Sequence, residues 1–260
     1  MKRSLILLLF SLMLAVFPAL AQDEADKTVR FNDIQFAFSP ALGTSVNVQQ
    51  VPGDPVADAG PGFSDAAKIQ FTLYDVGEPT DSLFDTGGVR VYRMADIAAY
   101  DFLQPIADRL QSLLAERPDL AQFEPTLEES VVSGLPYMPL MTHGQTMAAR
   151  ARYIDTDAVQ GISYVTVFRA DVGPFTNQDF LYTFQGITTD GQSCVTVTFP
   201  LRTDLFPEPQ GFDMAKFQAE LPAYLAESTA RLNAAAPEDF TPALDAADAL
   251  VRSIQIDSQS

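Results

Sequence analysis

Apolar and polar residues alternate in eight short stretches of the chain, a period of two that is typical of strands with one buried face. The expected strands span 29–38 (with a turn at Asn32-Asp33), 45–51, 69–73, 89–91, 150–154, 161–168, 180–186 and 193–199. The stretch 45–51 is expected to pair with 29–38. Thr189-Asp190-Gly191 separates the last two stretches. Because Asp-Gly favours a tight turn, this segment predicts a hairpin.

Three segments instead show helical spacing. In 105–116 a proline stands at the first position, which suits a helix start, and apolar residues follow on one face at Ile106, Leu110, Leu113 and Leu114. A second helix is expected after Asp213 as N-cap, with a kink at Pro222. Its apolar face would hold Met214, Phe217, Leu221, Tyr224 and Leu225. Thr241-Pro242 predicts the start of a last helix that buries Phe240, Leu244, Ala247, Val251 and Ile254.

This order of elements predicts an α+β fold: a mainly antiparallel sheet of about six to eight strands, covered by one central helix and two C-terminal helices. The segment 52–65 is rich in Gly, Pro and Asp and is expected to be a loop. Residues 117–147 carry no clear periodicity, but neither half of the chain has a full sheet without the other. We therefore expect 29–260 to form a single domain.

The first 21 residues have the pattern of a secretory signal peptide. Lys2 and Arg3 precede an apolar run over 5–17, and Pro18 and Ala19-Leu20-Ala21 follow. Cleavage is expected after Ala21, which would leave a short polar segment, 22–28, without structure. The run is too short to span a bilayer, and no later segment approaches the required length. The mature protein is thus expected to be secreted or periplasmic, without a membrane span.

Charge and cysteine content narrow the classes of partner. The chain has 34 acidic and 16 basic side chains, and loss of Lys2 and Arg3 with the signal lowers the net charge from −18 to about −20. Such a surface repels nucleic acids and anionic lipids. It is expected to keep the protein soluble and monomeric. Cys194 is the only cysteine, which rules out an intrachain disulfide, and its strand-like surroundings predict a packed side chain.

Acidic residues raise two catalytic hypotheses. Asp85-Thr86-Gly87 resembles the aspartic protease signature, which needs a second carboxylate to share one proton. The chain offers no second copy, since Asp190-Gly191 lacks the middle residue; a half-site homodimer or a simple turn into the 89–91 strand are the alternatives. A glycosidase needs only two carboxylates at a suitable separation. The sequence leaves this open, although there is no tryptophan to stack on a sugar.

The sequence gives little support for histidine-based catalysis, a metal site or a nucleotide site. His143 is the only histidine; no nucleophile elbow accompanies it, and neither Ser133 nor Ser193 has a supporting context. One histidine and one cysteine do not make a zinc site. Calcium suits the composition best, but the two acidic loops lack the EF-hand pattern; they contain Asp54, Asp58 and Asp65, and Asp75, Glu78 and Asp81. No phosphate-binding or dinucleotide motif is present. We assign no catalytic, cofactor-binding or metal-binding residue.

Two segments resemble a family of bacterial secreted proteins and lipoproteins. They are Asn177-Gln178-Asp179 with the run 180–192 and Phe199-Pro200, and Leu135-Pro136-Tyr137-Met138-Pro139. The family has no assigned activity, so the resemblance implies a shared hairpin and a proline-bound loop, and no functional residues. The strand–helix order, ending in Leu250 to Ile254, is also similar to the Mog1/PsbP type of sheet-and-helix sandwich. Fold alone does not give function.

These observations favour an exported, non-catalytic domain that binds a ligand or a protein at the cell envelope. The alternative is a secreted hydrolase that uses Asp85 or a carboxylate pair. A third hypothesis is a structural protein that depends on a partner, with 135–139 or the acidic loops as its contact.

Overall fold

The computed structural model describes residues 26–60, 64–75, 86–123, 134–207 and 211–257. The fold is α+β, as predicted, and contains two antiparallel sheets. The larger sheet has the strand order β3-β4-β5-β9-β8-β7-β6. Its strands are β3 (Ser45–Val51), β4 (Lys68–Tyr74), β5 (Gly87–Arg93), β6 (Gly144–Asp155), β7 (Val159–Arg169), β8 (Phe180–Thr188) and β9 (Ser193–Leu201). The smaller sheet has the order β1-β2-β10, formed by β1 (Lys27–Phe31), β2 (Ile34–Phe38) and β10 (Gln255–Ile256).

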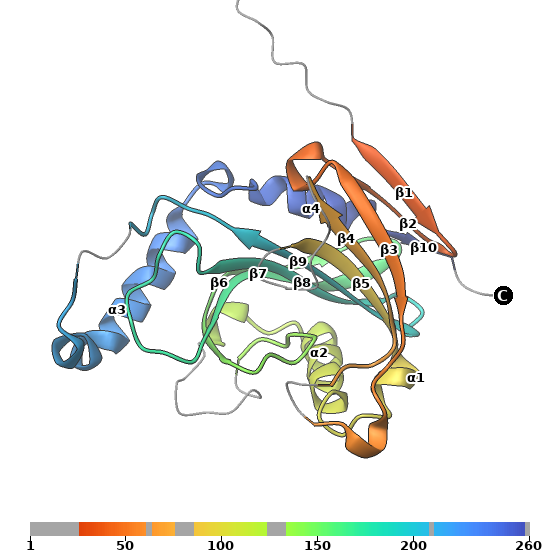
Figure 1. Ribbon diagram of the computed structural model, residues 1–260, viewed down its shortest axis with the longest axis horizontal. Helices are drawn as coiled ribbons and strands as arrows, with labels where there is room; N and C mark the ends of the chain where they lie inside the picture. The colour runs from red at the N-terminus through yellow and green to blue at the C-terminus, as the bar shows by residue number, and fades with distance from the viewer. Residues whose placement is uncertain (1–25, 61–63, 76–85, 124–133, 208–210, 258–260) are drawn as a thin grey trace, which may run out of the picture.

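Helices and the smaller sheet cover the two faces of the seven-stranded sheet (Figure 1). The short α1 (Met94–Ile97) and the longer α2 (Gln104–Glu116) lie on one face, here called the helix-side face. The three-stranded sheet and α4 (Leu244–Ser253) lie on the other, the hairpin-side face. The helix α3 (Met214–Ala234) packs against β6 at the left of Figure 1. Short 3-10 turns occur at Pro40–Leu42, Val56–Asp58, Leu120–Gln122 and Pro237–Asp239.

Each face of the larger sheet has its own hydrophobic core. On the hairpin-side face, alternate strand residues such as Val89, Val195 and Val197 are fully buried against β2 and α4. On the helix-side face, Leu110 and Leu113 of α2 pack with residues from β5, β7 and β9, among them Tyr92, Ile162 and Cys194. The strands are therefore buried on both sides at their centres.

Several local predictions differ from the structure. The β3 strand pairs with β4 along its whole length, whereas β1 and β2 pair with each other. β1 begins at Lys27, inside the segment 22–28 that was expected to lack structure. The last helix begins at Leu244 with Ala243 as its N-cap, because Thr241 instead forms a bridge with Arg202 of the β9 end. The α3 helix has Asp213 as its N-cap, as predicted, and contains Pro222.

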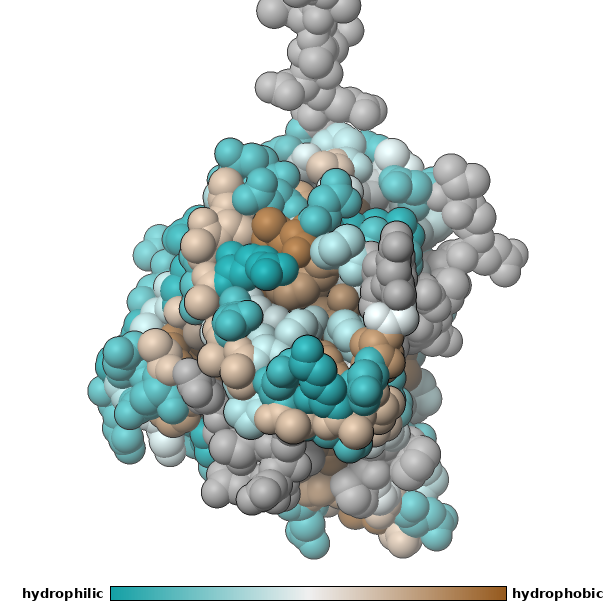
Figure 2. All heavy atoms as spheres, turned by 90° about the vertical axis from the view of Figure 1, so that its left-hand side faces the viewer, coloured by the Kyte–Doolittle hydropathy of each residue, from teal (hydrophilic) through white to brown (hydrophobic). Residues whose placement is uncertain are grey.

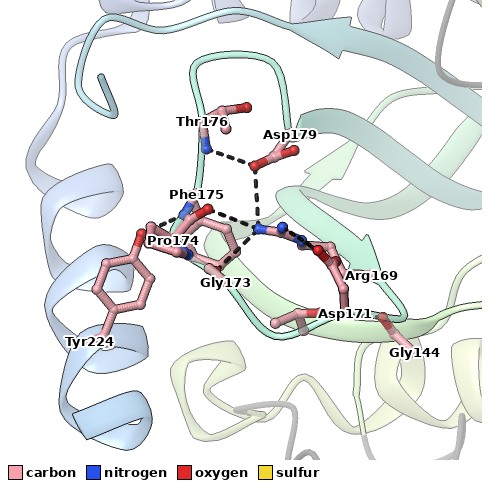
Figure 3. Close-up of polar contacts among 10 residues, drawn as sticks. Gly144, Arg169, Asp171, Gly173, Pro174, Phe175, Thr176, Asp179 and Tyr224 are labelled. Atoms are coloured by element: carbon pink, nitrogen blue, oxygen red, sulfur yellow. Dashed lines mark hydrogen bonds and ion pairs between the residues drawn. The ribbon is translucent and has the colours of Figure 1, made fainter. Parts of the chain in front are cut away.

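Arg169 at the end of β7 organises the loop that follows it (Figure 3). Its guanidinium binds Asp171 through two bonds of 2.8 and 2.9 Å and donates to the carbonyl oxygens of Gly173 and Pro174. Asp179 lies 3.5 Å from the same guanidinium. The side chain of Arg169 is only 16% exposed. One largely buried guanidinium, that of Arg169, therefore fixes the path of the loop from 170 to 179.

This loop attaches α3 to the body of the molecule. The N–H of Phe175 donates to the Tyr224 hydroxyl oxygen at 2.6 Å, and the two rings lie 5.5 Å apart. Phe175 also packs on Phe180 in β8. Farther out, Phe212 and Met214 are about half exposed. Figure 2 views this end of the molecule, where hydrophilic residues form most of the surface and apolar residues show between them.

Candidate functional site

A cleft of about 400 Å³ opens between the two sheets, at the end of the molecule opposite α3. Its apolar residues come from β2, β3, β4, β5 and β10. Polar residues from the β1–β2 turn, β3, β5, α1 and β9 stand beside them. The apolar set is Ile34, Val51, Ala67, Ile69, Val91 and Ile256, and the polar set includes Asn32, Asp33, Gln50, Arg93, Asp96 and Ser193. The lining is divided about evenly between apolar and polar residues, and concave sites of this size are where proteins commonly bind ligands.

The tight turn between β1 and β2 positions one wall of the cleft. Phe31 pairs directly with Ile34, so only Asn32 and Asp33 connect β1 to β2. Asn32 has φ of 53°, a left-handed conformation that asparagine tolerates better than most residues. The carbonyl oxygen of Asp33 accepts the N–H of Asp257 at 3.0 Å. The sequence pair Asn-Asp and the chain segment after β10 thus hold one wall of the cleft.

The charged groups at the cleft are partly compensated. Arg93 binds Asp96 through two bonds of 2.8 and 3.1 Å, and its side chain is largely exposed. Lys68 also borders the cleft, but its ammonium binds Asp65 at 2.7 Å and lies near the Tyr92 ring. The Asp33 side chain has no ion pair with the other residues in the described part of the chain. The rim is therefore neutral to acidic.

The β3 strand ends at this cleft and forms one edge of the seven-stranded sheet. It pairs with β4 over seven consecutive residues without a register shift. The sequence Ser-Val-Asn-Val-Gln-Gln-Val contains no charge and no proline. Within the described ranges, no strand pairs with its outer side. A free edge offers a row of backbone N–H and C=O groups to another strand.

The opposite edge of the sheet is protected. The pairing of β6 with β7 shifts register twice, between Gln145 and Met147 and between Ala149 and Arg152. Arg150 within the second shift has φ of 57°, and its N–H donates to the Asn233 side chain of α3 at 2.6 Å. Bulges and a covering helix are common ways to block strand addition. The β6 edge is thus protected against strand addition, whereas the β3 edge is regular and, among the described residues, has no strand paired with its outer side.

The residues considered for catalysis do not form a site in the described structure. His143 is exposed, and its Nδ1 lies 3.4 Å from the Thr142 hydroxyl. Ser193 begins β9 opposite Arg93, and its N–H donates to the Thr188 hydroxyl at 3.0 Å. Ser133 and Asp85 lie outside the described residues. Gly87, next but one after Asp85, already belongs to β5.

Cys194 and Asp190 have the structural positions that the sequence predicted. Cys194 is fully buried in the helix-side core, and burial raises the pKa of its thiol far above the ordinary value. Asp190 accepts the Thr188 hydroxyl at 2.6 Å and the Gln192 N–H at 3.0 Å. These bonds lower the pKa of the Asp190 carboxyl. Gly191 completes the hairpin turn with φ of 72°.

The acidic loops use their carboxylates for local bonds. Asp54 accepts the Asp65 N–H at 2.7 Å, and Asp75 accepts the Thr44 N–H at 3.0 Å. Asp65 accepts the Tyr92 hydroxyl as well as binding Lys68. Glu78 and Asp81 lie outside the described residues, whereas Asp58 lies within them. Among the residues that the structure describes, no three His, Cys, Asp or Glu side chains group as metal ligands.

Residues 135–138 of the segment 135–139, considered above as a partner contact, are buried against the sheet, and Pro139 is half-buried. The Pro136 carbonyl accepts the Tyr164 hydroxyl at 2.7 Å, and the Met138 N–H donates to Gln185 at 2.9 Å. These residues therefore pack within the fold.

Comparison with known proteins adds no assignment. No protein-family model matches the chain, and neither the curated proteins nor the solved structures searched give a match. No described helix has both the length and the apolar character needed to cross a membrane.

Proposed function

We propose that the protein is exported and acts without catalysis, binding an extended segment of a partner protein along β3 and into the adjacent cleft. The free, regular edge of β3 carries this proposal. Strand addition supplies main-chain hydrogen bonds, and a neighbouring pocket selects a side chain. Gln50 and Val51 belong both to β3 and to the cleft lining, so one strand along this edge reaches both.

The chemistry of the partner segment follows from the lining. Ile34, Ile69 and Val91 favour an apolar side chain in the cleft. The rim is neutral to acidic and the chain has a net charge of −18, so basic residues beside that side chain would be attracted. The segment is thus an extended basic peptide with an apolar anchor. Export rests on the N-terminal pattern described above.

The first experiment places a photo-crosslinking amino acid at Gln49, which is exposed on β3, and in a matched protein at Gln218, which is exposed on α3. Both are irradiated in the host envelope. A discrete crosslinked partner at Gln49 alone, whose crosslinked peptide is basic and extended, supports the proposal. Crosslinks at both positions, or none at Gln49, would contradict it. N-terminal sequencing of the exported protein is expected to start at Gln22.

A second experiment blocks the edge itself. Neighbouring residues of an antiparallel edge strand direct their amides to opposite sides. One of the variants Val48→Pro and Gln49→Pro therefore removes an N–H that points away from β4 and keeps the fold. That variant is expected to lose the crosslink from a reporter at Gln50 while its Tm stays close to that of the parent protein. Retention of the crosslink would contradict strand addition.

A further inference from the structure

The helix-side face of the larger sheet contains two adjacent rows of buried polar residues. The strand register places Gln70, Arg90, Thr196 and Gln185 in one row across β4, β5, β9 and β8. The next row holds Thr72, Gly88, Thr198 and Thr183. None of these seven side chains is more than 6% exposed. A polar group in such a place costs free energy unless it is hydrogen-bonded.

Some of these groups have protein partners. Arg90 donates from Nε to Gln70 at 2.9 Å, and Gln70 donates to the Thr72 hydroxyl at 3.3 Å. Thr183 donates to the Val197 carbonyl at 3.1 Å. Gln185 binds the backbone of the covering segment at Met138, as described above. One half of the polar face is therefore satisfied by the fold itself.

The remaining groups of the polar face are not satisfied in this way. Arg90 Nη1 and the Thr196 hydroxyl are buried without a hydrogen-bond partner, and the Thr198 and Tyr137 hydroxyls face each other and have no further partner among the described residues. In the described structure no carboxylate forms an ion pair with Arg90. Thr196 lies directly opposite Arg90, and Thr198 lies opposite Gly88, which adds no side chain.

Tyr137 faces the same place from the covering segment. Burial raises the pKa of its hydroxyl, whereas a hydrogen bond with the Thr198 hydroxyl and the Arg90 charge act in the opposite direction. Its ring packs on Phe168 with centroids 4.6 Å apart, which holds the side chain in this orientation. The register and the covering segment thus place one unpartnered guanidinium nitrogen, one unpartnered hydroxyl and the Tyr137–Thr198 hydroxyl pair on one buried part of the helix-side face.

We propose that these four groups bind the oxyanion of a small molecule, either a carboxylate or a phosphate or sulfate group. A buried guanidinium is suited to such planar or tetrahedral oxyanions, and hydroxyls complete their shell of donors. The bound anion would also neutralise the charge of Arg90. This site lies on the opposite face of the sheet from the cleft lining Ile69 and Val91, so it does not depend on the proposed function.

The test measures thermal unfolding of the purified full protein with acetate, citrate, phosphate or sulfate, each matched in ionic strength by sodium chloride. At least one oxyanion is expected to raise Tm saturably, by about 5 to 10 °C at a hundredfold excess over Kd. Citrate and acetate against phosphate and sulfate distinguish the two ligand classes. Absence of any shift beyond sodium chloride would overturn the proposal.

Variants test whether the ligand-induced rise in Tm depends on the buried polar groups. Arg90→Gln is expected to abolish the shift, whereas Arg30→Gln, an exposed arginine paired with Asp257, should keep it. Because Arg90→Gln can fail to fold, Thr196→Val and Thr198→Val provide a second test. Thr196→Val removes a hydroxyl without a partner, so Tm without ligand should stay the same or rise, while the ligand-induced shift falls. Thr198→Val also removes the contact with Tyr137, so only its ligand-induced shift is compared, and that shift should fall. An unchanged shift in both threonine variants would contradict the site.

Discussion

The ring of Phe184 in β8 covers Gly161 of the neighbouring strand β7, so closely that a Cβ atom at Gly161 would lie 2.5 Å from the ring. Gly186, which pairs with Gly161 in the register, lies under the same ring at the same distance. Two glycines on paired strands thus make room for one large aromatic side chain. This explains why the otherwise β-branched and aromatic strands β7 and β8 contain glycine at these positions.

Gly161→Ala is expected to lower the free energy of unfolding by about 1 to 3 kcal/mol, because the added methyl group overpacks a core without space. The measurement is urea unfolding followed by circular dichroism. Gly144→Ala is the matched control, since nothing lies within 4 Å of a Cβ atom there. Equal effects of the two substitutions would contradict the packing.

Asp248 of α4 joins the helix to the sheet through Arg152 and through Tyr182, whose hydroxyl donates to it at 2.9 Å. Asp248→Asn should cost about 1 to 3 kcal/mol of stability, because the change weakens an ion pair that is buried on the aspartate side and more open on the arginine side. Asp245→Asn, on the exposed side of the same helix, should change stability by no more than about 0.5 kcal/mol.

The ion pair between Arg117 and Asp155 predicts that the stability of the fold decreases at acidic pH. The Arg117 guanidinium bonds Asp155 at 2.6 and 2.9 Å and lowers the pKa of that carboxyl. The stabilisation is present above the unfolded-state pKa of about 3.9 and is lost as the pH falls through the lower folded-state value. Both side chains are partly exposed, so the effect is small and weakens with salt.

Asp155→Asn should therefore flatten the dependence of stability on pH below about pH 4. The experiment compares the urea midpoint at several acidic pH values at low and high salt. Asp157→Asn, an exposed aspartate nearby, is the control and should leave the curve unchanged. A steeper curve in the Asp155 variant would contradict the assignment.

Cys194 provides a probe of global unfolding. Its side chain is fully buried and burial raises the pKa of the thiol, so the reactive thiolate is scarce in the folded protein. We expect negligible reaction with Ellman's reagent at pH 8 and complete reaction in denaturant. Rapid labelling of the native protein would show that the helix-side core opens locally.

Alternation along the chain predicted most strands because one side of each is strongly apolar. Val195, Val197 and Phe199 illustrate this pattern in β9. The same pattern gave the wrong partner for 45–51, since pairing depends on contacts that the alternation does not encode. Helical spacing placed the start of the last helix two residues early, with Thr241 as N-cap where the structure has Ala243, because Thr241 pairs with Arg202.

The residues of the cleft and of the buried polar face were harder to predict from the sequence. Thr196 and Thr198 alternate with apolar residues and are typical of a solvent-facing strand side, yet α2 and the 135–138 segment lie on that face. An arginine in the middle of a strand, Arg90, was the one available signal. The cleft combines Asn32, Val91 and Ile256, which are too distant in sequence for any local pattern to connect them.

The position of β2 between β1 and β10 has a consequence for the order of folding. Gln35 pairs with Gln255, and the Ser253 hydroxyl binds the backbone of Ala37, so this sheet joins the beginning and the end of the described chain. Contacts this far apart form late, because a long loop must close first. The cleft wall that contains Ile256 is therefore complete only after β10 has paired with β2.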